Sequence, residues 1–191
     1  MIDFNEMVRE FLQSTAEWQW WVSQAFALVA MIFSITAMQQ KSTTRILWHR
    51  SFYSLLLLCG TFFLWKLPAI IMVGVGLLRT LVLLYLSYKS KVSKNTKRWV
   101  FAGLAAILIT LNIIFWENVL SILSIAVGLA YLIAFIQQKP VNIRHITVAA
   151  ASIGIVFYIL VFSPMNAVIN LSVLISTVVA LFRIDKPKKA A

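Results

Sequence analysis

Seven long runs of apolar residues follow one another along the chain, separated by short polar segments. A helix needs about 20 apolar residues to cross the roughly 30 Å hydrocarbon core of a bilayer. Backbone groups inside a membrane must be paired within the protein, and these runs are too long and too uniformly apolar for barrel strands. The pattern predicts an all-α polytopic membrane protein with seven transmembrane helices, at residues 18–38, 46–64, 69–88, 99–116, 118–136, 146–162 and 167–182.

Two of these runs are weaker than the others. The run at 46–64 carries His49 and Arg50 one turn after its start, so we expect the long side chain of Arg50 to reach the membrane interface. The run at 167–182 is short unless its helix begins at Pro164, a residue that is favoured in the first turn of a helix. We predict that both runs still cross the membrane.

Residues 1–17 carry a different pattern, in which apolar side chains return every three or four positions. This spacing is typical of one face of an amphipathic helix, and we expect the segment to lie on the membrane surface. Contact with a protein partner is the alternative. The segment is acidic, whereas the start of a signal peptide is basic. The apolar face would consist of Phe4, Met7, Val8, Phe11 and Leu12.

Composition and charge agree with a membrane protein and predict its orientation. Of the 191 residues, 61% are hydrophobic and 12% are charged, against about half and a quarter in soluble domains. The net charge is +11. Basic residues gather in the loops after the first, third and fifth runs and in the tail at 183–191, which predicts an external N terminus and a cytoplasmic C terminus. We interpret the basic segment at 89–98 as a contact with lipid headgroups, not with nucleic acid.

The supply of chemically reactive side chains is small. The chain has one cysteine, Cys59, together with two histidines and six carboxylates, which predicts neither a disulfide framework nor a metal site. Motifs for metalloprotease, nucleophile-elbow or phosphate-loop chemistry are absent from the sequence. We therefore expect no enzymatic activity, no catalytic residues and no cofactor.

A short tripeptide indicates an internal duplication. Gln39-Gln40-Lys41 ends the first run, and Gln137-Gln138-Lys139 ends the fifth. Superposing the two tripeptides without a gap aligns the first three runs with the last three. The predicted architecture is therefore two parallel three-helix repeats, at 18–88 and 118–182, joined by a linker helix at 99–116. Parallel repeats occur in secondary transporters, with a substrate site between them; a duplication kept only for packing is the alternative.

Arg79 is the sharpest candidate for a functional residue. It lies near the middle of the run at 69–88, and an arginine at a helix centre costs about 2.5–3.5 kcal/mol on insertion scales. Such a residue normally faces the bundle interior, and no carboxylate in the apolar runs is available to pair with it. We expect Arg79 to contact a polar or anionic solute; a structural arginine bonded to carbonyl groups is the alternative.

Further polar residues lie in the same helices. Asn166, Asn170 and Thr177 lie on one face of the helix predicted for the last run. In the alignment of the two tripeptides, Thr177 is the position that matches Arg79. We interpret all three as candidate substrate contacts, with hydrogen bonds between helices as the alternative. Gly76, one turn before Arg79, is a further candidate, and there we expect close helix packing.

Several segments resemble a known family. The stretch 24–37, the Arg45 loop, Leu78-Arg79-Thr80 and Ala180-Leu181-Phe182-Arg183 are similar to the YgjV-type bacterial inner membrane proteins. This resemblance implies a place in the bacterial cytoplasmic membrane and no particular activity. More remotely, the three-one-three layout resembles the SWEET sugar facilitators and PnuC-type vitamin transporters. The prolines here lie in loops or at helix ends, unlike the hinge prolines of the SWEET family.

Two functions fit these patterns. The first is a small-solute transporter or facilitator with its path between the two repeats. The second is a non-transporting membrane scaffold or assembly factor that uses the segment 1–17 and the basic face. A hydrated centre at Arg79 would favour the first, and a dry core with an apolar groove on the outer flank would favour the second. The lipid bilayer is the expected partner in both, and the pattern specifies neither a substrate nor an oligomeric state.

Overall fold

The computed structural model describes residues 18–63, 67–89, 93–115, 120–160 and 163–185, and within these ranges it is all helical. Six of its helices are long and apolar enough to cross a membrane. The 16-residue α6 is shorter, and the segment 1–17 lies outside the described residues. The helices are α2 Trp18–Met38, α3 Thr43–Phe63, α4 Leu67–Tyr88, α5 Lys94–Ile114, α6 Leu120–Phe135, α7 Pro140–Leu160 and α8 Pro164–Arg183.

Three helices begin before their apolar runs do. The structure starts α3 at Thr43, α5 at Lys94 and α7 at Pro140, three to six residues earlier than the hydropathy pattern predicts. The backbone hydrogen bonds of a helix continue along residues that have polar side chains. The bond from Ile143 N to Lys139 O at 3.2 Å is an example. Charged residues at these ends are therefore carried inside helices. The start of α8 at Pro164 is confirmed.

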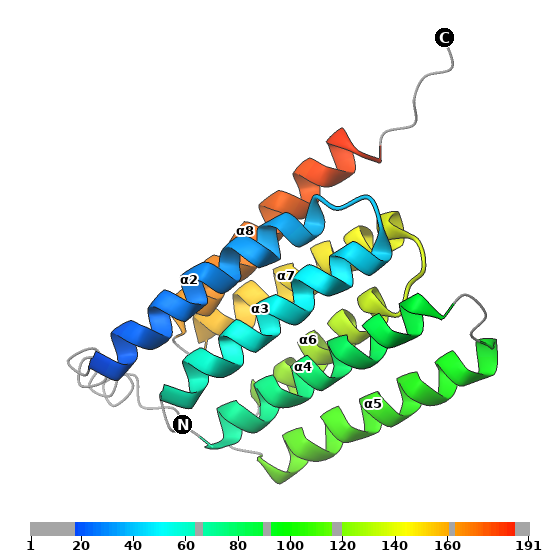
Figure 1. The fold of residues 1–191 in the computed structure, drawn as a ribbon. Coiled ribbons are helices and arrows are strands. Elements are labelled where there is room, and N and C mark those ends of the chain that lie inside the picture. The colour runs from blue at the N-terminus through cyan, green and yellow to red at the C-terminus, as the bar shows by residue number, and fades with distance from the viewer. Residues whose placement is uncertain (1–17, 64–66, 90–92, 116–119, 161–162, 186–191) are drawn as a thin grey trace.

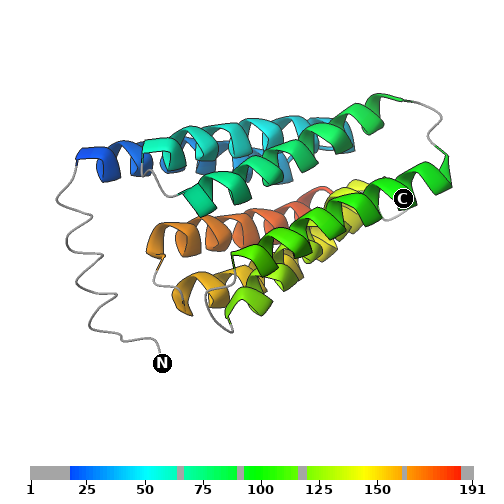
Figure 2. The ribbon, with the colours of Figure 1, turned by 90° about the horizontal axis from the view of Figure 1, so that it is seen from below.

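The helices form two packed groups of three. Figure 1 shows α2, α3 and α4 side by side, with α6, α7 and α8 behind them and α5 at the edge. Figure 2 shows the same two groups as two layers. Helix α2 also packs against α8, and α4 contacts α6. These two pairs of helices connect the two layers. The arrangement as two parallel repeats and the duplication itself stay predictions.

The C-terminal ends of α2, α4, α6 and α8 lie at one end of the bundle (Figure 1). We call this end the basic end, because the predicted basic loops are here. The topology thus brings together the segments that the charge pattern assigns to one side of the membrane.

Small residues let neighbouring helices approach closely. The buried face of α2 is made of Ser23, Ala27, Ala30, Ser34, Ala37 and Met38. A Cβ added at Gly60 of α3 would lie 3.2 Å from the carbonyl oxygen of Ser23, and one at Gly154 of α7 would lie 2.8 Å from Oδ1 of Asn170. Close contact between small residues drives helix association where lipid removes the hydrophobic effect.

The expectation of close packing at Gly76 is wrong. A Cβ added there would meet no described atom within 4 Å. Helix α4 also continues through Gly76 without a break, and the carbonyl of Gly76 accepts a hydrogen bond from Thr80 Oγ1 at 3.3 Å. The glycines that pack closely are Gly60, Gly128 and Gly154.

Candidate functional site

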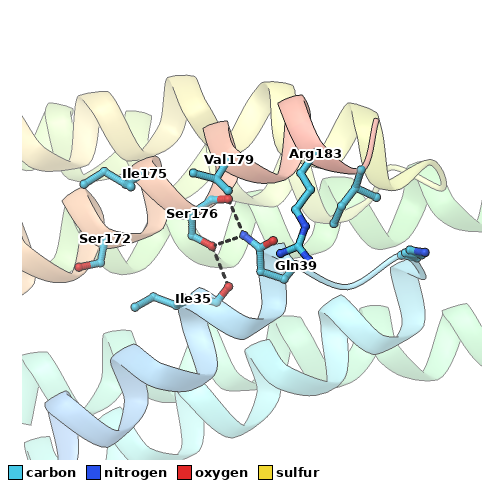
Figure 3. Close-up of a pocket in the computed structure, with 9 residues that line it drawn as sticks. Ile35, Gln39, Ser172, Ile175, Ser176, Val179 and Arg183 are labelled. Atoms are coloured by element: carbon cyan, nitrogen blue, oxygen red, sulfur yellow. Dashed lines mark hydrogen bonds between the residues drawn. The ribbon is translucent and has the colours of Figure 1, made fainter. Parts of the chain in front are cut away.

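A groove of about 830 Å³ follows the seam between α2 and α8 on the flank of the bundle. Its walls include Ile35, Gln39 and Ser176 (Figure 3). Gln39 Nε2 donates to the carbonyl and the hydroxyl of Ser176 at 2.8 and 2.9 Å, and Ser176 Oγ donates to Ile35 O at 2.9 Å. These polar groups join the two helices, and the groove also carries Lys41 and Arg183 near the basic end.

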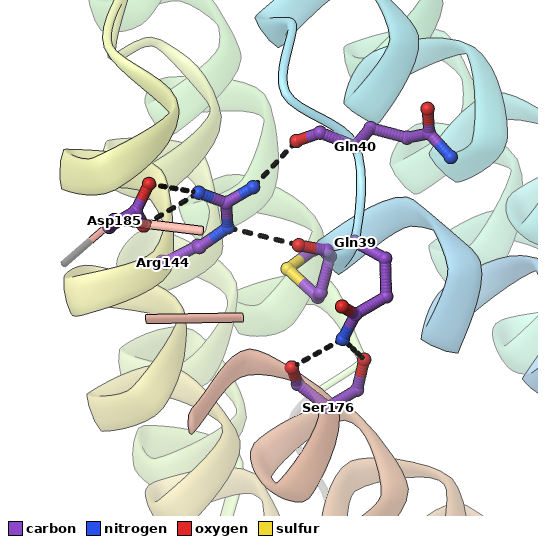
Figure 4. Close-up of polar contacts among 6 residues, drawn as sticks. Gln39, Gln40, Arg144, Ser176 and Asp185 are labelled. Carbon is purple, nitrogen blue, oxygen red and sulfur yellow. Dashed lines mark hydrogen bonds and ion pairs between the residues drawn. The ribbon is translucent and has the colours of Figure 1, made fainter. Parts of the chain in front are cut away.

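Arg144, in the second turn of α7, joins three segments at the basic end (Figure 4). Its Nε donates to Met38 O at 2.9 Å and its Nη2 to Gln40 O at 2.6 Å. Its Nη1 pairs with the carboxylate of Asp185 at 2.6 Å. The side chain is fully buried, and each nitrogen has an acceptor. Arg144 therefore ties the end of α2 and the end of α8 to α7.

Arg50 lies deeper, in the second turn of α3, and its surroundings differ. Only 4% of the residue is exposed, so the expectation that it reaches the interface is wrong. Its Cζ atom lies 5.2, 5.5 and 5.2 Å from the ring centroids of Tyr53, Tyr131 and Phe135. Among the described residues, nothing accepts a hydrogen bond from Nε or Nη2 of Arg50. We call these two nitrogens the Arg50 edge.

Arg79 reaches the same aromatic cluster from α4. Its Nη1 donates to the carbonyl of Gly128 in α6 at 3.2 Å, and its Cζ lies 5.9 Å from the ring centroid of Phe135. The Nε of Arg79 is buried and finds no acceptor in the described part of the chain. Two guanidinium groups therefore lie close to the ring of Phe135, between the two layers of helices.

Asn170 connects the cluster to α8. The hydroxyl of Tyr131 donates to Oδ1 of Asn170 at 2.8 Å, and Nδ2 of Asn170 donates to the carbonyl of Asn166 at 2.9 Å. Asn166 itself bonds Ser163 Oγ at 2.9 Å, at the start of α8. The hydroxyl of Thr177 bonds its own helix at Val173 O, 2.6 Å away. The structure thus brings Asn170 to the cluster and gives Thr177 a partner within α8.

A second cavity opens at the basic end, between the two groups of helices. It has a volume of about 560 Å³ and is lined by the starts of α3 and α7 and the ends of α4 and α6. We call it the vestibule. Lys41, Lys89 and Lys97 line it, and so does Phe135, whose ring contacts both Arg50 and Arg79. Phe135 therefore stands between the vestibule and the buried arginines.

Comparison with known proteins identifies the family. A family model named Imp-YgjV and described as a bacterial inner membrane protein matches residues 21–188. The chain belongs to this family. No curated protein and no solved structure matches the chain, and the remote likeness to the SWEET and PnuC-type transporters stays a prediction.

In this Imp-YgjV protein the structure brings some of the predicted site residues together with others that were not predicted. Arg79 and Asn170 belong to one cluster, because each forms a hydrogen bond with a residue of α6. The hydrogen bonds described above join neither Thr177, Asn166 nor Gly76 to an arginine. Sequence reasoning missed Arg50 and Phe135 as members. One signal was present, because Arg50 and Tyr53 lie one helical turn apart, as Tyr131 and Phe135 do.

The cluster lacks the ligand types of a metal site. Within the described ranges, no group of three or more His, Cys, Asp or Glu side chains comes together. The available groups are guanidinium and amide donors and tyrosine hydroxyls. Such an arrangement binds and orients a polar group by hydrogen bonds and charge.

Proposed function

We propose that this bacterial inner membrane protein carries a small polar solute along a path between α2–α3–α4 and α6–α7–α8. One observation carries the proposal. Polar side chains of α3, α4, α6 and α8 meet between the two layers, and the buried Arg50 edge and Nε of Arg79 have no acceptor in the described structure. An unsatisfied buried charge is expensive, and a site that receives a solute accounts for it.

The vestibule supplies the entrance in this proposal. By the positive-inside rule the basic end faces the cytoplasm, so the vestibule opens there and Phe135 separates it from the cluster. The two triplets act as the two halves of a duplicated carrier, with the site at their interface, as in transporters built from parallel repeats. The proposal assigns no catalytic step to any residue.

A membrane scaffold is the second candidate function, and the groove between α2 and α8 favours it. This groove lies on the outer flank, and Ile35, Ile175 and Val179 give it an apolar wall. A scaffold would seat a partner helix there and keep the centre of the bundle dry.

Cysteine accessibility distinguishes the two functions without knowledge of the solute. Cys59 is the sole cysteine, so Cys59→Ser gives a cysteine-free background. Ser54, one turn beyond Arg50 on α3, is 7% exposed, and Ser54→Cys places a thiol beside the cluster. We expect this thiol to react with charged methanethiosulfonate reagents applied from either side of oriented vesicles, because a path is reached by water from both sides.

Two matched variants serve as controls. Leu55, the next residue on α3, is 44% exposed. In the bilayer it faces lipid, so the thiol of Leu55→Cys should not react. Lys89→Cys lines the vestibule and should react from the basic end. If the Ser54→Cys thiol stays unreactive from both sides while Lys89→Cys reacts, the centre is dry and the scaffold function replaces the transporter.

A further inference from the structure

We infer that the solute is a small oxyanion, carrying a carboxylate or a phosphoryl group, and that the Arg50 edge binds it. This inference rests on the proposed function and names the substrate class of the same site. It makes Arg50 the principal contact, with Arg79 as the second positive charge.

The geometry of the unpaired nitrogens points to this class. Nε–H and one N–H of Nη2 lie side by side on a guanidinium plane, and their spacing matches the two oxygens of a carboxylate or phosphate. Among the described residues, both nitrogens of the Arg50 edge lack an acceptor, and so does Nε of Arg79. The rings of Tyr53, Tyr131 and Phe135 surround Cζ of Arg50, and none of these side chains accepts a hydrogen bond from Nε or Nη2.

The charge balance points the same way. In the described part of the chain, Asp185 is the sole carboxylate, and it is already paired with Arg144. Arg50 and Arg79 both contact Phe135, so two positive charges lie close together with no carboxylate of the described residues beside them. Like charges repel strongly at low dielectric, and an anion bound between them removes that repulsion. A neutral solute would leave it in place.

The vestibule fits an anionic solute as well. Lys41, Lys89 and Lys97 line it, and a cleft lined by one sign of charge raises the local concentration of the opposite ion. Its volume of about 560 Å³ lies within the usual range for small-molecule sites. Anions are therefore attracted to the entrance before they meet the arginines.

Thermal unfolding of the purified full chain in detergent tests the binding site. The probes are acetate, inorganic phosphate, glycerol and choline at one ionic strength, with phosphatidylglycerol as a separate arm. We expect acetate or phosphate, well above its Kd, to raise the Tm of the wild type by about 5 °C or more. The shift should vanish in Arg50→Gln and shrink in Arg50→Lys, which keeps the charge but lacks the two-nitrogen edge.

The labelling rates of Ser54→Cys provide a second measurement that does not depend on the choice of solute. Two methanethiosulfonates are compared, the anionic sulfonatoethyl reagent and the cationic trimethylammonioethyl reagent. The labelling rate of each is divided by the rate at which the same reagent reacts with a small free thiol. We expect the anionic reagent to be favoured by about tenfold or more, as in clefts lined by positive charge. Adding Arg50→Gln should abolish this preference.

The outcomes separate this inference from the proposed function. If both reagents react but without preference, or if glycerol stabilises as well as acetate and phosphate do, the path stands and the oxyanion site is wrong. If only phosphatidylglycerol raises the Tm, a lipid phosphate occupies the edge and the solute site is also wrong. If neither reagent reaches the thiol, both proposals fail together.

Discussion

Arg144 and Arg50 are both buried arginines, near the starts of α7 and α3, and their guanidinium groups have opposite surroundings. Arg144 meets one carboxylate and two backbone carbonyls at 2.6 to 2.9 Å. Arg50 meets three aromatic rings, and no acceptor among the described residues bonds its edge. In Arg144, which serves packing, every guanidinium nitrogen has a hydrogen-bond acceptor. The two nitrogens of the Arg50 edge have no such acceptor among the described residues.

The largest expected effect is on stability at Arg144. Arg144→Met leaves the carboxylate of Asp185 and the carbonyls of Met38 and Gln40 without their donor. Breaking a buried pair by removing one partner costs about 3–5 kcal/mol, so the Tm in detergent should fall sharply. Asp185→Asn in the same chain should restore part of the loss, because it removes the stranded charge. Equal Tm values for wild type and Arg144→Met would contradict this assignment.

The same substitution at Arg50 should have the opposite sign. Arg50→Met removes a buried charge that has no anionic partner among the described residues and fills the space with an apolar side chain of similar length. Such replacements range from neutral to about 4 kcal/mol stabilising. Thermal unfolding beside Arg144→Met gives the comparison directly. A loss as large as that of Arg144→Met would show that Arg50 is structural and has a partner in the folded protein.

Two glycines sharpen the comparison at a smaller scale. In Gly154→Ala the new Cβ would lie 2.8 Å from Oδ1 of Asn170, so α7 or Asn170 must shift and the bond to Tyr131 is strained. Overpacking of this kind costs about 1–3 kcal/mol, which chemical or thermal unfolding will detect. Gly76→Ala is the control, since nothing described lies within 4 Å and helix propensity improves by about 1 kcal/mol.

The apolar pattern predicted the helices well and their starts at the basic end poorly. All seven predicted spans correspond to helices of the described structure, because a run of apolar residues in lipid has no other way to pair its backbone. The starts of α3, α5 and α7 were predicted too late along the chain. An apolar run ends at a charged side chain, whereas backbone hydrogen bonding continues past it. The six residues by which α7 begins earlier than predicted include Arg144, and its burial was therefore missed.

The candidate substrate contacts stay predictions, but some members of the cluster could be anticipated from the sequence. Arg79 was predicted because it is far from both ends of its helix, so any packing would hold it inside the membrane. Arg50 lies near enough to a helix start that its side chain had two destinations, the interface or the core. The rotation of α3 about its axis, set by contacts such as Gly60 against Ser23, turned Arg50 toward the rings of α6.

The sequence by itself thus determined that this is an all-helical membrane protein, where its helices lie and that Arg79 belongs in the interior. These conclusions depend on local hydropathy and on distance along one helix. The tertiary structure alone decided which helix faces meet. It paired Arg144 with Asp185, surrounded Arg50 by aromatic rings with no carboxylate of the described residues beside it, and brought Phe135 into contact with both the vestibule and the two arginines. Each of these relations joins residues that are far apart in the chain.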